Sequence, residues 1–419
     1  MKQRISQIIR DMRQQPLVAT VTFIATVLSI FLFMVVVITT RVKVVPFAPE
    51  SCRDRLLVGQ YIHIADPGNG NYGSSGGMSY ATARKLYGGL KGVEHTSYFQ
   101  SLQTQSACGE DGKYFNVYTR PTDSEFFKIF DHKLIAGRYY TAAEAASDLP
   151  VAVVSERTAR KAFGTVDCTG REISLNHKRY RVVGVVSDHS FLAATACGDV
   201  FLACGSDENQ DMFGDTSVAL LVAEGTDFGE IRRQVKARYA VFDTELAPEN
   251  RVTVYHEGPF DQETIAGGIP GSNNTPDTSS DRYVRFTLYA LLLLVPAINL
   301  SSLLHSRMRR RISEIGVRRA FGCTRRRLIT DIIRENFIIT LAGGIVGVVL
   351  GLVFALTYSG LYEDMDTYGS GVTPALDSVI NWGTILIALG VCFILNLISA
   401  FVPAWQASRL NPVEAINAK

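Results

Sequence analysis

The sequence lacks the short motifs that support most enzyme chemistry. It contains no GxxxxGK[ST] loop for nucleotide phosphates, no HExxH metal motif and no GxSxG nucleophile turn. None of its seven histidines lies four residues from another, and its seven cysteines include no CxxC spacing. We therefore expect no catalytic residue, no metal site and no cofactor bound by this chain.

The chain also has few charged residues and many apolar ones. Charged side chains make up 20% of the 419 residues and hydrophobic ones 47%, with a formal net charge of +2. This balance is typical of a membrane protein with a sizeable soluble part. The basic tracts are not interleaved with aromatic residues, so they indicate membrane topology and contact with lipid, and we expect no nucleic-acid partner.

Four apolar runs have the length and composition of membrane spans. They are Leu17–Thr40, Phe286–Leu304, Phe337–Tyr358 and Trp382–Phe401. The fold class predicted is a membrane protein with four transmembrane α-helices and a large mixed α/β extracytoplasmic domain between the first and second. Both termini are expected in the cytoplasm, with an amphipathic helix over residues 1–15. The predicted domains are 1–40 (amphipathic helix and first span), 41–282 (external domain) and 283–419 (three spans and the tail).

The external region, 41–282, alternates between strand and helix patterns. Its apolar runs and turn residues predict a strand at Leu56–Ile64 and a helix at Tyr80–Tyr87, followed by a strand at Val151–Val154 that leads into a helix at Glu156–Phe163. Further along, they predict a hairpin of Glu172–Leu175 with Tyr180–Val186 and a β-α-β run over 217–256. A flexible stalk is predicted at Gly258–Ser280. Cys197 and Cys204 are the external cysteines closest in sequence, and either a disulfide or two separate thiols would suit them.

A strongly basic segment, Arg307–Glu335, lies between the second and third spans. It holds ten arginines against three acidic residues, and a short basic segment beside spans stays in the cytoplasm. Gly322 interrupts it, and Thr324 is placed to cap the helix that continues into the third span. Two interpretations remain open: a topology-setting loop at the lipid headgroups, or a docking helix for a soluble partner.

Within the third span, Gly343, Gly347 and Gly351 form a face of small residues. Such a face predicts a close crossing with another helix, and adaptation to lipid or a bend is the alternative.

Five blocks of the sequence stand out as motifs: EFFKIFDHKLIAGRYY (Glu125–Tyr140), VAVVSERTARKAFG (Val151–Gly164), YRVVGVVSD (Tyr180–Asp188), SEIGVRRAFGCTRRRL (Ser313–Leu328) and PAWQASRLNPVEAI (Pro403–Ile416). They resemble blocks of the MacB/FtsX-type ABC transporter permeases, which have a MacB-like periplasmic core domain and an FtsX-like permease domain. Residues 52–115 match only by their place in the architecture. The insert at 192–212 is not a recognised family feature.

The resemblance implies a homodimeric, multi-pass inner-membrane permease that works with a separate ABC ATP-binding subunit, which would hold ATP and Mg²⁺. In this family the permease is thought to transmit force (mechanotransmission) for efflux: export or extraction of an amphipathic substrate such as a peptide, lipoprotein or drug. A periplasmic adaptor and an outer-membrane channel are further expected partners. The coupling helix lies within 307–335, and by motif its ATPase-contacting residues would be Glu314, Ile315, Gly316, Val317, Arg318, Arg319, Ala320 and Gly322.

Two other functions are compatible with parts of this pattern. An FtsX-like transmembrane signalling scaffold that activates a periplasmic cell-wall hydrolase would have the same architecture. A membrane-tethered periplasmic enzyme is the remaining class, and the missing catalytic motifs argue against it.

Overall fold

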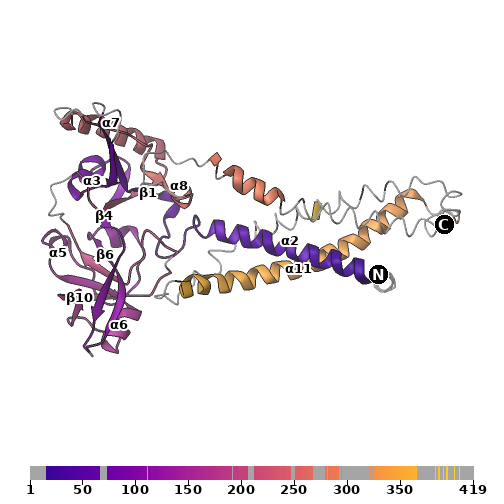
Figure 1. Ribbon diagram of the computed structural model, residues 1–419, viewed down its shortest axis with the longest axis horizontal. Helices are drawn as coiled ribbons and strands as arrows, with labels where there is room; N and C mark the ends of the chain where they lie inside the picture. The colour runs from indigo at the N-terminus through magenta and orange to yellow at the C-terminus, as the bar shows by residue number, and fades with distance from the viewer. Residues whose placement is uncertain are drawn as a thin grey trace. The chain divides into compact units, whose positions relative to one another are not determined.

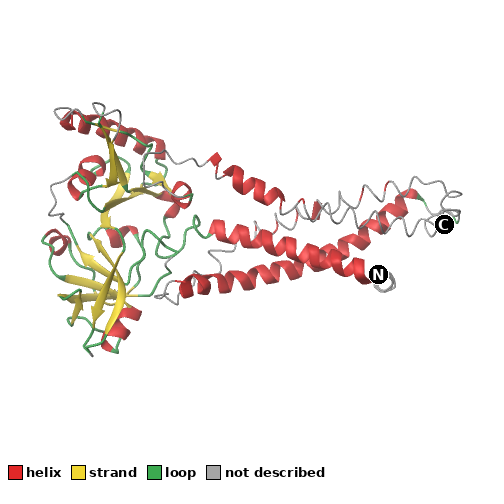
Figure 2. Cartoon of the chain, viewed as in Figure 1, coloured by secondary structure: helices red, strands yellow, loops and turns green. Residues whose placement is uncertain are grey.

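A computed structural model of the chain divides into two compact units, which are described separately (Figures 1 and 2). One unit comprises Met1–Thr40, Ser280–Thr357 and Val379–Lys419; the other comprises Arg41–Ser279 and Tyr358–Ser378. The structure describes residues 16–66, 73–110, 112–190, 192–205, 212–246, 251–267, 279–280, 282–291 and 324–365, with isolated positions 294, 321, 383, 386, 390, 393, 394, 401 and 405.

Two long helices form the described core of the first unit. Helix α2 (Pro16–Arg41) covers the predicted first span, and α11 (Arg325–Met365) covers the third. Among the described residues, one segment, Phe23–Arg41 of α2, is long and apolar enough to cross a membrane, and Thr340–Ala355 of α11 is a shorter apolar stretch. Residues 282–291 are helical, but most of the second and fourth predicted spans lies outside the described residues. The count of four spans, and the helix over 1–15, therefore stay predictions.

Six strands of the second unit close into a ring. They follow the order β11-β8-β10-β9-β5-β6, and β11 also pairs with β6. The strands are β5 (Gln103–Cys108), β6 (Tyr114–Thr122), β8 (Val151–Ser155), β9 (Glu172–Leu175), β10 (Lys178–Val186) and β11 (Val200–Ala203). Ala152 and Val154 of β8 lie in one buried cluster, whereas Val151 and Val153 lie in another. Both faces of this strand are therefore buried, as its uninterrupted apolar sequence predicts.

The same sheet continues into a layer covered by helices. Its strands are β4 (Val93–Gln100), β12 (Thr216–Val222), β1 (Leu56–Gly59) and β14 (Phe260–Asp261), in the order β4-β12-β1-β14. On one face, Val218 and Leu220 of β12 pack in a cluster with Leu86 of α3 (Tyr80–Tyr87) and Ile231 of α7 (Phe228–Leu246). The period-two alternation of β12 thus buries one set of side chains under the helices and the other set in the central cluster.

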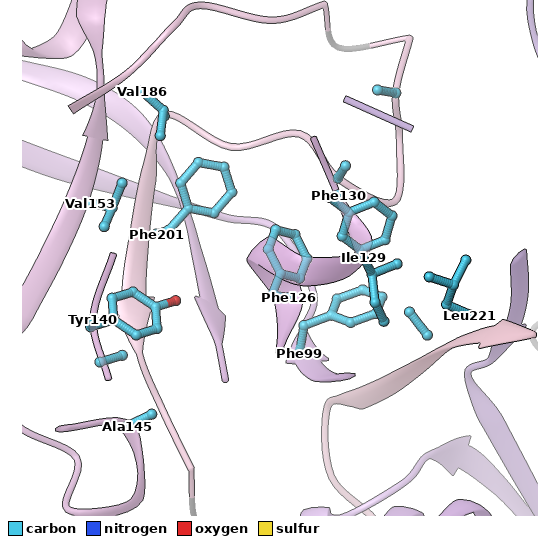
Figure 3. Close-up of a cluster of buried hydrophobic side chains, with 14 of the residues drawn as sticks. Phe99, Phe126, Ile129, Phe130, Tyr140, Ala145, Val153, Val186, Phe201 and Leu221 are labelled. Atoms are coloured by element: carbon cyan, nitrogen blue, oxygen red, sulfur yellow. The ribbon is translucent and has the colours of Figure 1, made fainter. Parts of the chain in front are cut away.

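The central cluster connects the ring and the layer. Phe126 of α4 (Phe126–Ile129) lies between Phe201 of β11 and Phe130 in Figure 3, with ring centroids 5.7 and 4.6 Å away. Leu221 of β12 and Val153 of β8 belong to the same cluster. The cluster therefore makes the ring and the layer one packed body.

Several local predictions are confirmed. Helix α6 (Glu156–Phe163) ends where Gly164 adopts a left-handed conformation, with φ of +71°. Strands β9 and β10 form the predicted hairpin, and its turn residues Asn176 and His177 both have positive φ, as a two-residue hairpin turn requires. The turn is two residues long, so β10 begins earlier than predicted, at Lys178.

One prediction about the external region is wrong. Leu56–Ile64 is not one strand, because β1 pairs with β12 and β14 whereas β2 (Tyr61–Ala65) pairs with β3 (Gly73–Gly77) and β13 (Val252–Thr253) in a separate three-stranded sheet. The predicted strand–helix–strand order over 217–256 is confirmed as β12, α7 and β13, and the two strands lie in different sheets.

The stalk predicted at Gly258–Ser280 is structured over its first part. Phe260 pairs with Val58 in β14–β1, and α8 (Gln262–Ala266) follows. Asp261 caps α8, because its Oδ1 accepts hydrogen bonds from the N–H and hydroxyl of Thr264, and it also pairs with Arg232 at 3.2 Å. A carboxylate with these partners fixes a segment whose Gly- and Pro-rich composition indicated flexibility.

Candidate functional site

The predicted ATPase-contacting residues, Glu314–Ala320 and Gly322, lie outside the described residues. Phe321, within the same motif, is described and has 88% of its surface exposed. The assignment of this coupling motif stays a prediction. The structure does define three features of the described residues: the start of α11, the crossing of α2 with α11, and a buried ion pair after α2.

Helix α11 begins at the residue that the sequence predicted. The hydroxyl of Thr324 accepts a hydrogen bond from the N–H of Arg327 at 3.4 Å, and the helix runs without interruption for 41 residues. At 1.5 Å per residue this is a rod of about 60 Å. The exposed side chains of Arg326 and Arg327 in its first turn and the apolar stretch Thr340–Ala355 therefore belong to one helix. A displacement at the basic end would move the apolar part as well.

The predicted small-residue face of α11 is confirmed as a close helix crossing. A Cβ atom added to Gly347 would lie 2.9 Å from both the Cβ of Ile30 and the carbonyl oxygen of Val27 in α2. A Cβ at Gly351 would lie 2.7 Å from the Cβ of Met34. Because real Cβ atoms do not approach this closely, only glycine permits the two backbones to come together here.

A buried ion pair follows α2 by a few residues. Arg53 donates from Nε to Oε2 of Glu50 at 2.5 Å, and the two side chains are only 1% and 0% exposed. Arg53 Nη1 donates to the carbonyl oxygens of Val42 and Val45 at 2.9 and 3.0 Å. Val42 directly follows the last residue of α2. One guanidinium therefore holds the chain at residues 42–45, the first residues of the second unit.

The other contacts of this pair reach a distant segment. Arg53 Nη2 donates to the carbonyl oxygen of Leu192 at 2.9 Å, and Glu50 Oε1 accepts from the N–H groups of Thr195 and Ala196 at 2.8 and 2.9 Å. We call Glu50, Arg53 and these bonded groups the exit junction. Both carboxylate oxygens and all three guanidinium nitrogens have partners, which is the condition under which a buried ion pair is tolerated.

A second buried arginine holds the same segment. Arg120 of β6 donates from Nε to the carbonyl oxygen of Cys197 at 2.7 Å and from Nη2 to that of Ala194 at 3.0 Å. Its side chain is buried, and its guanidinium lies 5.5 Å from the ring centroid of Phe99. Residues 192–198, the start of the insert that the family resemblance left unassigned, are thus held by two buried cations from other parts of the chain.

The possible Cys197–Cys204 disulfide is not formed in the structure. Both residues are thiols. Cys197 Sγ lies 3.7 Å from Nη2 of Arg120, whereas Cys204 Sγ lies 3.9 Å from Nε2 of Gln100. The alternative of separate thiols fits this arrangement, in which each sulfur has a different polar neighbour.

Two buried histidines lie beside the segment held by Arg120. The rings of His132 and His189 are 4.8 Å apart, and Nε2 of His189 accepts a hydrogen bond from the N–H of Gly198 at 3.0 Å. Burial lowers the pKa of His189 to about 4. Burial, with the neighbouring His189, also lowers the pKa of His132 well below its ordinary value. Both imidazoles are therefore neutral near pH 7, and acid would protonate them only at the expense of the fold.

Sequence reasoning missed the exit junction and Arg120. Nothing local marks them, since Glu50 and Arg53 occur in an unremarkable polar stretch and their partners lie up to 146 and 139 residues away. Their burial alone distinguishes them, because charged residues are almost never fully buried unless paired.

Together, two long helices with apolar stretches and a large mixed α/β domain are typical of a membrane protein with a sizeable domain outside the lipid. The chain belongs to the MacB/FtsX-type ABC transporter permeases. The family "MacB-like periplasmic core domain" matches residues 17–238, and "FtsX-like permease C-terminal" matches residues 286–412. It is accordingly a membrane permease with a large periplasmic domain.

Three curated relatives illustrate the similarity. The macrolide export ATP-binding/permease protein MacB of Bdellovibrio bacteriovorus is 24% identical over 286 residues, covering 67% of this chain and 41% of the relative. The pyoverdine export ATP-binding/permease protein PvdT of Pseudomonas savastanoi is 25% identical over 73% of this chain and 44% of the relative. The uncharacterized ABC transporter permease YknZ of Bacillus subtilis is 22% identical over an aligned region that covers 78% of this chain and 77% of the relative. The chain thus spans about two-fifths of the length of the first two relatives.

Proposed function

We propose that this chain is the permease subunit of a mechanotransmission-type ABC transporter of the inner membrane. A separate ATP-binding subunit would bind and hydrolyse ATP with Mg²⁺, and the permease would convert that movement into a change in its periplasmic domain. The substrate would be amphipathic, a peptide, lipoprotein or drug that is exported or extracted. The relatives named for macrolide and pyoverdine export support an export role.

The observation that supports this proposal most directly is the continuity of α11. The capped basic end and the apolar stretch belong to one continuous helix, and the glycines of that helix pack against side chains of α2. The chain that leaves α2 is then fixed by the exit junction to residues 192–196 of the periplasmic domain. Within the first unit, a push on the basic end of α11 would be passed to α2 through this close crossing, and within the second unit the exit junction would hold residues 42–45 against 192–196.

The same proposal includes the topology and the partners. The chain would cross the membrane four times with both termini in the cytoplasm, and it would work as a homodimer with two ATP-binding subunits. The sequence contains no phosphate-binding loop, which favours a partner that supplies ATP hydrolysis. A periplasmic adaptor and an outer-membrane channel would complete the route out of the cell.

Copurification with the ATP-binding subunit tests the proposal. The full chain would be coexpressed with a candidate ATP-binding subunit, and association and ATP hydrolysis would be measured. We expect Gly316→Trp and Arg318→Glu to lose both association and stimulation, while Arg310→Glu, a matched charge reversal outside the motif, retains them.

Three results would count against parts of the proposal. Normal association of the Arg318→Glu variant would remove the coupling assignment. Equal losses in Arg310→Glu and Arg318→Glu would mean that the segment acts only through its charge. Absence of any associated ATPase, together with activation of a cell-wall hydrolase by the periplasmic domain, would replace the transporter with a signalling scaffold.

A further inference from the structure

Two histidines from distant parts of the sequence share one face of the three-stranded sheet. His63 lies in β2, and its carbonyl oxygen accepts a hydrogen bond from the N–H of Val254, just beyond the end of β13. Val254 is therefore the cross-strand neighbour of His63. His256 follows two residues later, so in extended backbone its side chain is directed to the same side as that of Val254 and stands diagonal to His63.

The two imidazoles are close to each other and incompletely hydrogen-bonded. Their ring centroids lie 5.8 Å apart, with ring planes inclined by 55°. Nδ1 of His63 and Nε2 of His256 are buried and have no hydrogen-bond partner. His63 is 6% exposed. A buried ring nitrogen without a partner is costly, so two of them side by side make this pair a candidate ligand site.

The separation of the rings fits a shared metal ion. A histidine nitrogen binds zinc at about 2.0–2.1 Å and lies about 1.1 Å from its ring centroid, so two rings on one ion have centroids about 5 Å apart at a tetrahedral angle and about 6.3 Å apart in a line. The observed 5.8 Å lies within this range. Imidazole nitrogen is a ligand that zinc and copper both accept.

We propose that His63 and His256 form a two-histidine site for a transition-metal ion of the Zn²⁺ or Cu²⁺ type, a role that goes beyond the proposed transport function. Within the described residues no group of three or more histidines, cysteines or acidic side chains could hold a metal. The described residues therefore supply two ligands, and water would supply the rest. The side of β2 opposite β13 is occupied by β3 (GSSGG), and a Cβ added to Gly73 would lie 3.0 Å from Cε1 of His63, so the small residues of β3 accommodate the imidazole.

The bound ion would tie two strands of the small sheet together. His63 belongs to β2, and His256 belongs to the segment between β13 and β14, which contains the left-handed Glu257 (φ +61°). The sequence predicted no metal site, because none of its histidines has the four-residue spacing of ligands on a helix. Cross-strand pairing brings these two together instead.

Zinc titration of the full-length chain tests the site. The protein would be purified in detergent through an affinity tag that contains no histidine, and Zn²⁺ alone would be titrated in competition with a chromophoric chelator. We expect one equivalent to bind, and His63→Asn or His256→Asn to weaken binding by at least about tenfold, since loss of even an outer-shell partner costs about 10–100-fold.

The matched control is His177→Asn. His177 is exposed and lies in the β9–β10 turn at φ of +69°, a conformation that asparagine tolerates. This variant should bind zinc as the wild type does. Unfolding temperatures with and without Zn²⁺ give a second readout: zinc should raise that of the wild type and of His177→Asn, but not that of either site variant.

Electron paramagnetic resonance of the Cu²⁺-loaded chain would count the ligands. Coupling to two imidazole nitrogens that is lost in both site variants is the expected result. No zinc equivalent under competition, or equal affinity in the site variants and the wild type, would overturn the proposal. None of these measurements depends on an ATP-binding subunit, so failure here is distinguishable from failure of the transport proposal.

Discussion

Replacing Arg53 with methionine should destabilise the periplasmic domain more than any surface substitution. Methionine keeps much of the length of the side chain but removes every donor of the exit junction. Glu50 would remain a buried carboxylate with only the two N–H groups of Thr195 and Ala196 as partners. Removing one member of a buried ion pair costs about 3–5 kcal/mol, and we expect a loss of this size in the free energy of unfolding.

A second substitution separates electrostatics from packing. Glu50→Gln retains an oxygen that can accept from the two N–H groups but removes the charge. The double variant Glu50→Gln/Arg53→Met should therefore be about 1–3 kcal/mol more stable than Arg53→Met alone, because the uncompensated buried charge is gone. If the exit junction acted only by filling space, the second substitution would add a further loss instead of a recovery.

Hydrogen exchange on the full-length chain is the most direct assay. Both tryptophans, Trp382 and Trp405, lie outside 41–279, so tryptophan fluorescence does not report on the periplasmic domain. Exchange of the N–H groups at 192–197 should accelerate in Arg53→Met by roughly two to three and a half orders of magnitude. This factor corresponds to the expected loss of about 3–5 kcal/mol, because about 1.4 kcal/mol changes an equilibrium tenfold. Near-UV circular dichroism during urea unfolding would give the global free energy.

The control variant is Arg160→Met, which breaks an exposed pair with Glu156 on α6. Such pairs contribute about 0.3–0.5 kcal/mol, so its exchange at 192–197 should equal that of the wild type. Unchanged protection of 192–197 in Arg53→Met would refute the view that the exit junction fixes this segment. Loss of export with ATP hydrolysis retained would be the functional consequence in an assembled transporter.

Three further predictions concern the helix crossing, the buried histidines and the start of α11. Gly347→Leu should lower the stability of the detergent-solubilised chain by about 1–3 kcal/mol because it forces the two helices apart, whereas Val349→Leu, at an exposed position of the same helix, should leave the unfolding temperature unchanged. The pKa of His189 is about 4 when folded against an ordinary value of about 6.5, so the unfolding free energy of the domain should fall as the pH decreases from about 6.5 toward about 4. Across this pH range, the urea concentration at the unfolding midpoint should fall less steeply with decreasing pH in His189→Gln than in the wild type. Equal slopes in the two proteins would contradict the lowered pKa of His189. Thr324→Ala should speed exchange in the first turn of α11 by removing a cap that stabilises by about 1 kcal/mol, while Thr330→Ala, inside the helix, should not.

Local features of the sequence predicted the long helices and some of the strands of the described part, whereas β4, β5, β6 and β11 were not predicted. Helix α6 could be placed because an apolar strand precedes it and Gly164 follows it. The cap at Thr324 and the glycines of α11 were also readable, since each depends on neighbours within one or two helical turns. The coupling motif, Glu314–Gly322, was recognised by its order of residues, and its role stays a prediction.

Features that depend on distant partners could be decided only by the tertiary structure. Leu56–Ile64 is mostly apolar, and no local period shows that the chain changes sheets at Gln60. In the sequence, Asp261 is an acidic residue in a Gly- and Pro-rich stretch with no sign of a structural role. Its role follows from its contacts with Arg232 and Thr264 in the structure.

The same reason explains why the exit junction and the His63–His256 pair were not foreseen. Arg53 binds Leu192 across 139 positions, and His63 meets His256 only because β2 and β13 pair. By itself the sequence determined where the apolar helices, the basic segment and the turns lie, because those signals are local. Which buried charges find partners, and which side chains from separate strands come to share a face, was decided only when the strands paired and the core closed around them.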